Sequence, residues 1–242
     1  MTLPTERTKP SDNLWDHSIY LYGPPMIGKS SLVNEIPGVL FFNTAGGLES
    51  LPVYETRINA CEDFLTTGAE FLTGSHNFAV AAIDTIERLH KLCVQYIIKR
   101  ENIRHPQDLE FGKGYDMVKD EFIRPLTKLA LSKYGLIMIG HTRDVEITLR
   151  TRKLSKNIPT LQDYIWQLVA GLSDIIMFYT TETTDKGTRR VIKTNPSEEY
   201  IAGDRTNKLR SFGDIVMLPE GNNWARIEEA FNRVIPTKGE DK

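Results

Sequence analysis

A glycine-rich loop carries the clearest chemical signal in the sequence. It reads Gly23-Pro24-Pro25-Met26-Ile27-Gly28-Lys29-Ser30, followed by Ser31, and matches the spacing Gly-x-x-x-x-Gly-Lys-Ser. In such a loop the backbone N–H groups surround the phosphates of a nucleotide, the lysine reaches the β- and γ-phosphates, and the serine hydroxyl ligates Mg²⁺. We therefore expect residues 23–31 to bind ATP, with Lys29 as a catalytic residue. A glycine-rich turn that matches by accident is the alternative.

Two polar residues stand where later strands are predicted to end. Asp84 follows the apolar run Phe78–Ile83, and we expect it to hold Mg²⁺ together with Ser30. A carboxylate that only caps the next helix is the alternative. His141 follows the apolar run Leu136–Ile139 and is expected to sense the γ-phosphate, although a purely structural histidine fits the same position. The carboxyl ends of parallel strands form a ligand crevice, so these residues are predicted to lie close together.

The elements that must position these residues alternate between strands and helices. Short, continuously apolar strands are typical of a parallel sheet covered on both faces by helices. The fold class predicted is therefore α/β: a P-loop NTPase with a central, mostly parallel sheet and antiparallel strands at one edge. Residues 1–16 are predicted to form a flexible N-terminal arm, and residues 17–242 one domain. The expected strands are 18–22, 39–43, 78–83, 136–139, 175–180 and 190–194, and the expected helices are 29–36, 56–73, 86–97, 118–129, 161–172 and 223–234.

The bulk composition narrows the class of protein. The 242 residues carry a net charge of −2, so a nucleic acid would have to be held by local basic patches. No apolar run reaches the roughly 20 residues that span a bilayer, so no membrane partner is expected. The first residues also lack the apolar core of a signal peptide, and we expect a soluble, cytoplasmic protein. Cys61 and Cys93 are predicted to be separate core thiols.

The order of these motifs resembles the RecA-type ATPase core, and in particular the short recombinase-like ATPases of bacteriophages, which include Sak-type single-strand annealing proteins. The resemblance covers roughly residues 17–215. Besides the loop, it rests on the segments Phe42–Leu48, Ile83–Thr85, Phe111–Tyr115, Gly140–Thr142 and Ala202–Arg205.

The resemblance implies an ATPase that uses ATP and Mg²⁺ and assembles into a homo-oligomeric ring or filament with ATP between neighbours. It also implies single-stranded DNA bound by two loops, here 99–114 and 143–156. If the protein is of phage origin, it would act in the host cytoplasm with a phage or host single-strand-binding protein as a further partner.

One position departs from the family pattern. Active relatives carry a glutamate after the second strand that activates the attacking water, and the matching residue here is Ala45. General-base catalysis contributes about 10²–10⁴-fold, so we expect slow hydrolysis. Glu49, one helical turn further on, is the candidate substitute base.

Several cations are candidates for contacts outside the phosphate loop. Residues 143–156 carry a net charge of +3, which suits phosphate contacts, but a solvated surface loop is the alternative. In the other segment Lys113 lies between Phe111 and Tyr115, rings on which bases could stack or which could anchor the loop to the core. Two late cations are candidates for reaching the γ-phosphate of a neighbouring subunit, or are plain surface residues. The DNA-binding candidates are Lys113, Arg143, Arg150, Arg152, Lys153 and Lys156, and the trans-subunit candidates are Arg205 and Lys208.

Three functions remain open at this point. The first is an ATP-dependent single-stranded-DNA-binding protein of the recombination or annealing type. The second is a P-loop ATPase that loads or remodels a protein assembly without binding DNA. The third, a small-molecule kinase, requires an acceptor pocket and usually a basic lid over the phosphates.

Overall fold

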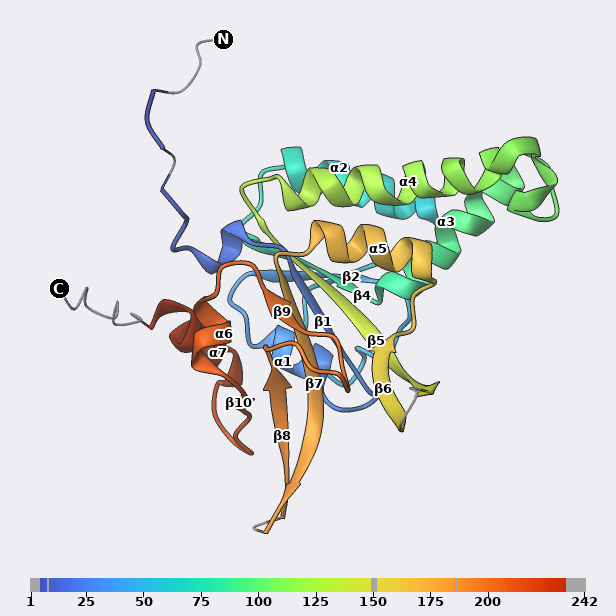
Figure 1. Ribbon diagram of the computed structural model, residues 1–242. Helices are drawn as coiled ribbons and strands as arrows, with labels where there is room; N and C mark the ends of the chain where they lie inside the picture. Colours follow the sequence, from blue (N-terminus) through green and yellow to red (C-terminus); the bar gives the residue numbers. More distant parts are fainter. Residues whose placement is uncertain (1–4, 8, 149–151, 186, 234–242) are drawn as a thin grey trace.

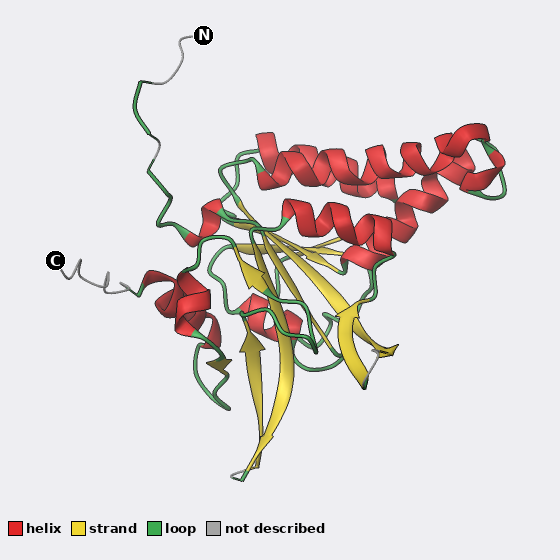
Figure 2. Cartoon of the chain, viewed as in Figure 1, coloured by secondary structure: helices red, strands yellow, loops and turns green. Residues whose placement is uncertain are grey.

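A computed structural model describes residues 5–7, 9–148, 152–185 and 187–233 of the chain. Its centre is a sheet with the strand order β10-β8-β7-β1-β5-β4-β2-β3, with β6 paired to β5 and β9 paired to β7 (Figures 1 and 2). The parallel strands are β1 Ile19–Gly23, β2 Val39–Asn43, β3 Glu55–Arg57, β4 Val80–Asp84, β5 Gly135–Thr148 and β7 Ile175–Thr184. The antiparallel strands are β6 Lys153–Pro159, β8 Gly187–Lys193, β9 Gly203–Asp204 and β10 Ile215–Val216.

Helices cover both faces of this sheet, and each face has its own apolar core. One core packs α1 Lys29–Asn34, α6 Lys208–Phe212 and α7 Asn223–Asn232 against the sheet. The other packs α2 Cys61–Thr73, α3 Ile86–Arg100, α4 Lys113–Ala130 and α5 Asp163–Leu172 against the opposite face. Short 3₁₀ turns, η1 Leu14–Asp16, η2 Pro106–Asp108 and η3 Glu110–Gly112, complete the described elements. The central strands β1, β2 and β4 are buried throughout, which explains their unbroken apolar sequences.

The fold class predicted from the sequence is confirmed, and several local predictions need correction. Residues 143–148 and 153–156, which were expected to be parts of a loop, are paired strands: β5 continues to Thr148 and pairs with β6 as an antiparallel hairpin. Helix α4 runs unbroken through Pro125. Cys61 and Cys93 are joined by a disulfide, so the prediction of two separate thiols was wrong. Their Cα atoms lie 4.9 Å apart because the start of α2 packs on α3, a contact that the sequence separation of 32 residues conceals.

Two hairpins extend the sheet beyond the end of β1. Strand β1 lies between β5 and β7, and its last residues pair with His141 and Phe178. Both neighbours continue past that point, to Thr148 and Thr184, before they turn back. The segment that connects β1 to α1 therefore lies between the β5–β6 and β7–β8 hairpins, which project from the same end of the sheet (Figure 1).

The N-terminal segment is attached to the body before β1 begins. Leu14 is buried in the core, and the ring of Trp15 stacks on that of Trp224 in α7 with centroids 5.8 Å apart. The last residues of the predicted arm therefore pack on the domain.

None of the helices in the described ranges has the length and apolar character needed to cross a membrane.

Candidate nucleotide site

The loop between β1 and α1 has the backbone that its glycines allow. A Cβ atom at Gly23 would lie 2.1 Å from the carbonyl oxygen of Tyr179 on β7, so only glycine fits there. Gly28 has a φ of 102°, in the left-handed region that favours glycine. Met26, also left-handed at φ 63°, is fully exposed at the tip of the loop. Residues 23–31 thus form a tight turn that leads into α1, with the exposed Ser31 in its first helical turn.

Lys29 is held against the loop that it is expected to serve. Its Nζ donates hydrogen bonds to the carbonyl oxygens of Gly23 at 3.0 Å and Pro24 at 2.8 Å, and the residue is only 6% exposed. Burial lowers the pKa of the ammonium to about 8, against the opposing influence of the Asp84 and Glu87 carboxylates. A buried cation whose direct hydrogen-bond partners are neutral carbonyls is well suited to receive an anion.

Ser30 and Asp84 meet across the end of the sheet. The Ser30 hydroxyl donates to Asp84 Oδ2 at 2.5 Å, and burial raises the pKa of the Asp84 carboxyl, while the Ser30 hydrogen bond and Lys29 lower it. Within the described ranges, no cluster of three or more His, Cys, Asp or Glu side chains could cage a metal. Mg²⁺ in nucleotide sites takes one or two protein ligands and completes its shell with phosphates and water. A hydroxyl next to a carboxylate, beside a loop that can surround phosphates, fits that requirement.

The end of β2 is tied to the end of β4 but does not bring Glu49 into contact with these groups. Thr44 accepts from the backbone N–H of Thr85 at 2.8 Å and donates to its carbonyl at 2.9 Å. Glu49 instead forms an ion pair with Arg57 at 2.5 Å, and its side chain is 64% exposed. The Arg57 hydrogen bond lowers the pKa of the Glu49 carboxyl, which makes it a weaker base. Ala45 is exposed on the same turn.

His141 lies opposite the phosphate loop and is supported by a residue that the sequence did not single out. Its Cα is the register partner of Gly23, and its backbone N–H donates to Glu87 Oε1 at 2.6 Å. The same oxygen accepts from the Thr160 hydroxyl at 2.9 Å, at the end of the β5–β6 hairpin. Burial lowers the pKa of the His141 imidazole, and Lys29 adds to this effect. One signal could have identified Glu87: it lies three residues after Asp84, in the first turn of α3.

Arg190 is the second residue that the prediction of the site did not include. It comes from β8, and its guanidinium donates to the carbonyl of Ile27 at 3.4 Å. An added Cβ at Gly28 would lie 3.0 Å from the same nitrogen. No carboxylate of the described residues forms an ion pair with Arg190, which leaves a cation beside the phosphate loop. Only the pairing of β8 with β7 brings it there.

The predicted DNA-binding cations do not all lie on one face of the protein, and several of them are paired with carboxylates. Arg143 lies 3.9 Å from Asp163, Lys153 lies 2.7 Å from Glu146, and Arg152 pairs with Glu198. Lys153 pairs with Thr148 and Lys156 with Val145, so the two lysines occupy opposite faces of the hairpin. Lys113 is exposed at the first position of α4, and Arg150 lies outside the described residues. The exposed ion pairs are each worth about 0–1 kcal/mol, so a phosphate could replace the carboxylate at little cost.

The two trans-subunit candidates make contacts within the chain. Arg205 lies 3.3 Å from Asp174 and donates to the carbonyl of Gly171 at 2.9 Å. Asp174 in turn accepts from the backbone of Ser18, which precedes β1, so Arg205 is at the opposite end of the sheet from the phosphate loop. Lys208 pairs with Asp12 at 2.7 Å.

Comparison with known proteins assigns the domain. A family model described as an AAA domain matches residues 16–206, which is most of the chain. Among solved structures, the flagellar accessory protein FlaH from Methanocaldococcus jannaschii matches with a TM-score of 0.41 and 10% sequence identity, covering 74% of this chain and 77% of that chain. A similarity at that level carries no argument about function. No curated protein sequence matches the chain.

Proposed function

Since the chain belongs to the AAA domain family, we propose that it is an ATP- and Mg²⁺-dependent ATPase with slow turnover that binds single-stranded DNA and acts as a homo-oligomer. The biological role that we propose is recombination or annealing of the phage type. The observation that carries the DNA-binding part is the continuity of β5. This strand passes His141 beside the phosphate loop and continues without a break into the basic β5–β6 hairpin.

The nucleotide chemistry follows from groups already in place. Lys29 exchanges two loop carbonyls for phosphate oxygens, which satisfy the buried ammonium better because they are charged. Ser30 and Asp84 would hold Mg²⁺, which would supply positive charge beside the phosphates. His141, whose Cα is the register partner of Gly23, donates one ring N–H towards a phosphate oxygen.

Slow hydrolysis follows from the absence of a suitable base at the end of β2. Ala45 cannot accept a proton, and Glu49 is directed to Arg57. We therefore expect ATP to act mainly as a switch that orders the hairpin. Steady-state ATPase assays test this: rapid turnover that Glu49→Gln abolishes would establish Glu49 as the base and overturn slow hydrolysis.

The DNA-binding part is tested by titrating a labelled single-stranded oligonucleotide with the protein at two salt concentrations. The titration is repeated with Mg²⁺ and a non-hydrolysable ATP analogue. We expect binding that the analogue strengthens and salt weakens. A triple alanine variant of Arg152, Lys153 and Lys156 should lose affinity and show a shallower salt dependence. The matched control replaces three exposed cations elsewhere on the surface, Arg124 and Lys128 of α4 and Lys133 in the turn after it.

Two results would redirect the proposal. Equal losses in the hairpin and control variants would mean that net charge, and not the hairpin, holds the DNA. No binding by the wild type under any nucleotide condition would favour an ATPase that loads or remodels a protein assembly.

A further inference from the structure

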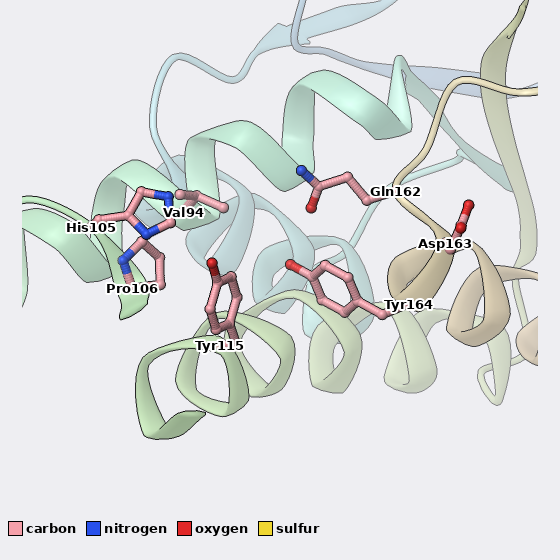
Figure 3. A pocket seen from close by; sticks show the side chains of 7 residues that line it. All are labelled: Val94, His105, Pro106, Tyr115, Gln162, Asp163 and Tyr164. Carbon is pink, nitrogen blue, oxygen red and sulfur yellow. The ribbon is translucent and has the colours of Figure 1, made fainter. Parts of the chain in front are cut away.

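A cavity of about 590 Å³ lies between α3, α4 and the start of α5 (Figure 3). Val94 of α3, the pair His105 and Pro106, and Tyr115 of α4 form one side. Residues 162–164, which follow the β5–β6 hairpin, form the other. Its volume is typical of cavities that bind small ligands. The cavity therefore borders the segment 99–114, predicted from the sequence to contact DNA, and the residues that follow the β5–β6 hairpin.

A close backbone contact fixes the first wall of this cavity. A Cβ atom at Gly114 would lie 2.1 Å from the carbonyl oxygen of Pro106, so only glycine lets the first turn of α4 approach η2 so closely. The next residue, Tyr115, is thereby placed with its ring centroid 6.0 Å from that of His105. The wall is built by packing of the backbone and does not depend on a ligand to form.

The cavity offers aromatic rings and uncommitted hydrogen-bonding groups. The rings of Tyr115 and Tyr164 are nearly perpendicular, with centroids 6.2 Å apart, and both hydroxyls point into the same space (Figure 3). The Tyr164 hydroxyl is hydrogen-bonded to His90 at 3.1 Å. Within the described ranges, the Tyr115 hydroxyl and the Gln162 amide have no hydrogen-bond partner, and Figure 3 shows the amide directed inward. A flat ring with polar edges matches this combination.

Three cations lie near the cavity, among carboxylates that include Asp163 in its wall and Glu110 and Asp116 close to Lys113. Arg104 precedes His105, Lys113 lies two residues before Tyr115, and Arg143 approaches the Asp163 carboxylate at the cavity rim. The nearby Asp108 is already engaged, since it accepts the backbone N–H groups of Arg104 and His105 at 2.9 and 2.8 Å.

An exposed aromatic ring next to the cavity adds a second place for stacking. Phe111 is fully exposed and has a φ of 57°, a left-handed conformation that is uncommon for a bulky residue. It belongs to η3, which packs against both η2 and α4. Strained and exposed side chains of this kind are found at binding sites.

We propose that this cavity receives one unstacked base of single-stranded DNA. The base stacks on Tyr115, and the Gln162 amide bonds to its polar edge. A smaller cavity of about 270 Å³ shares Val94 and Gln162 with the base site and extends to Glu87. Because Glu87 accepts the backbone N–H of His141, this second cavity connects the base site with the surroundings of His141. This inference rests on the proposed DNA binding and specifies one of its subsites.

The test compares two labelled oligonucleotides of equal length and charge, an oligothymidylate and a version with abasic sites at its central positions. Affinities are measured for the wild type, Tyr115→Ala, Tyr115→Phe and the control Tyr54→Ala, which removes an exposed tyrosine next to β3. Tyr115→Phe keeps the ring and removes only the hydroxyl, so it separates the contribution of the ring from that of the hydroxyl. The abasic oligonucleotide separates lost stacking from a folding defect, because a folding defect would weaken the binding of both oligonucleotides.

We expect Tyr115→Ala to bind oligothymidylate about 5- to 150-fold more weakly, the range that base–aromatic stacking gives in single-strand binders. Tyr115→Phe should keep most of the affinity, and the salt dependence should not change, because no phosphate contact is removed. The abasic oligonucleotide should bind the wild type and Tyr115→Ala equally.

Equal losses for both oligonucleotides, or no loss for either, would overturn the base site while leaving DNA binding in place. If the wild type binds neither oligonucleotide, the proposed DNA binding fails, and the base site falls with it. The comparison of wild type with variant therefore separates the two failures.

Discussion

Replacing Lys29 by methionine should change how the free energy of unfolding depends on pH, because Lys29 carries a buried charge. In the folded chain without nucleotide, burial lowers the pKa of Lys29 from 10.5 to about 8. At 1.36 kcal/mol per pKa unit, holding the charged ammonium in the fold costs about 3 kcal/mol below pH 8. Between pH 8 and 10.5 the unfolded state binds the extra proton, so the wild type gains stability as the pH rises. Lys29→Met has no such dependence at this position.

The quantity to measure is the difference in unfolding free energy between Lys29→Met and the wild type, from urea denaturation with EDTA and without nucleotide. We expect this difference to shift by about 2 kcal/mol in favour of the wild type between pH 7 and 9.5. The loss of the hydrogen bonds to Gly23 and Pro24 changes the difference in unfolding free energy by a constant amount, so it does not affect the shift with pH. Lys128→Met, an exposed lysine on α4, serves as the control and should run parallel to the wild type.

A difference in unfolding free energy between Lys29→Met and the wild type that stays the same at both pH values would refute the buried-charge reasoning.

A second measurement tests the role of Lys29 in nucleotide binding. With Mg²⁺ and ATP at a hundred times the dissociation constant, the wild type should gain about 2.7 kcal/mol of stability. The variant should gain none under the same conditions.

Three further changes test the surroundings of the site. A Cβ at Gly140 would lie 2.2 Å from the Tyr20 hydroxyl, so Gly140→Ala should cost about 1–3 kcal/mol in urea denaturation, and Tyr20→Phe should restore part of it; additive losses would contradict this contact. Glu87→Ala should lower the free energy of unfolding by about 1–3 kcal/mol, because the His141 N–H loses its acceptor. Glu87→Gln keeps an acceptor oxygen and should cost less, and equal losses in the two variants would argue against the hydrogen bond. Arg190→Ala should weaken ATP binding about tenfold in calorimetric titration, and unchanged affinity would show that the cation serves only the loop backbone.

The phosphate site was largely predictable because its parts are local. The glycine spacing, the lysine and the serine are contiguous, and an apolar strand before them fixes their place at a sheet end. The placement of Asp84 and His141 at this end of the sheet was predicted by the same rule, since the end of a buried strand is visible as the end of an apolar run. The contact of Ser30 with Asp84 and the pairing of Gly23 with His141 place these residues together.

What only the tertiary structure decided depends on contacts between distant segments. Glu87 is unremarkable as a helix-start glutamate until it meets His141 and Thr160, and Arg190 reaches the phosphate loop only because β8 folds back on β7. The β5–β6 hairpin was missed because most residues of its two strands are polar, although Val145 and Ile147 alternate with polar residues as in a strand. The pairing of β5 with β6 decides that these residues form a strand pair. Hydrophobic periodicity records burial along one element. It contains no information about which polar side chains meet when separate elements pack, so the sequence specified the loop and the fold class, and the structure specified the neighbours.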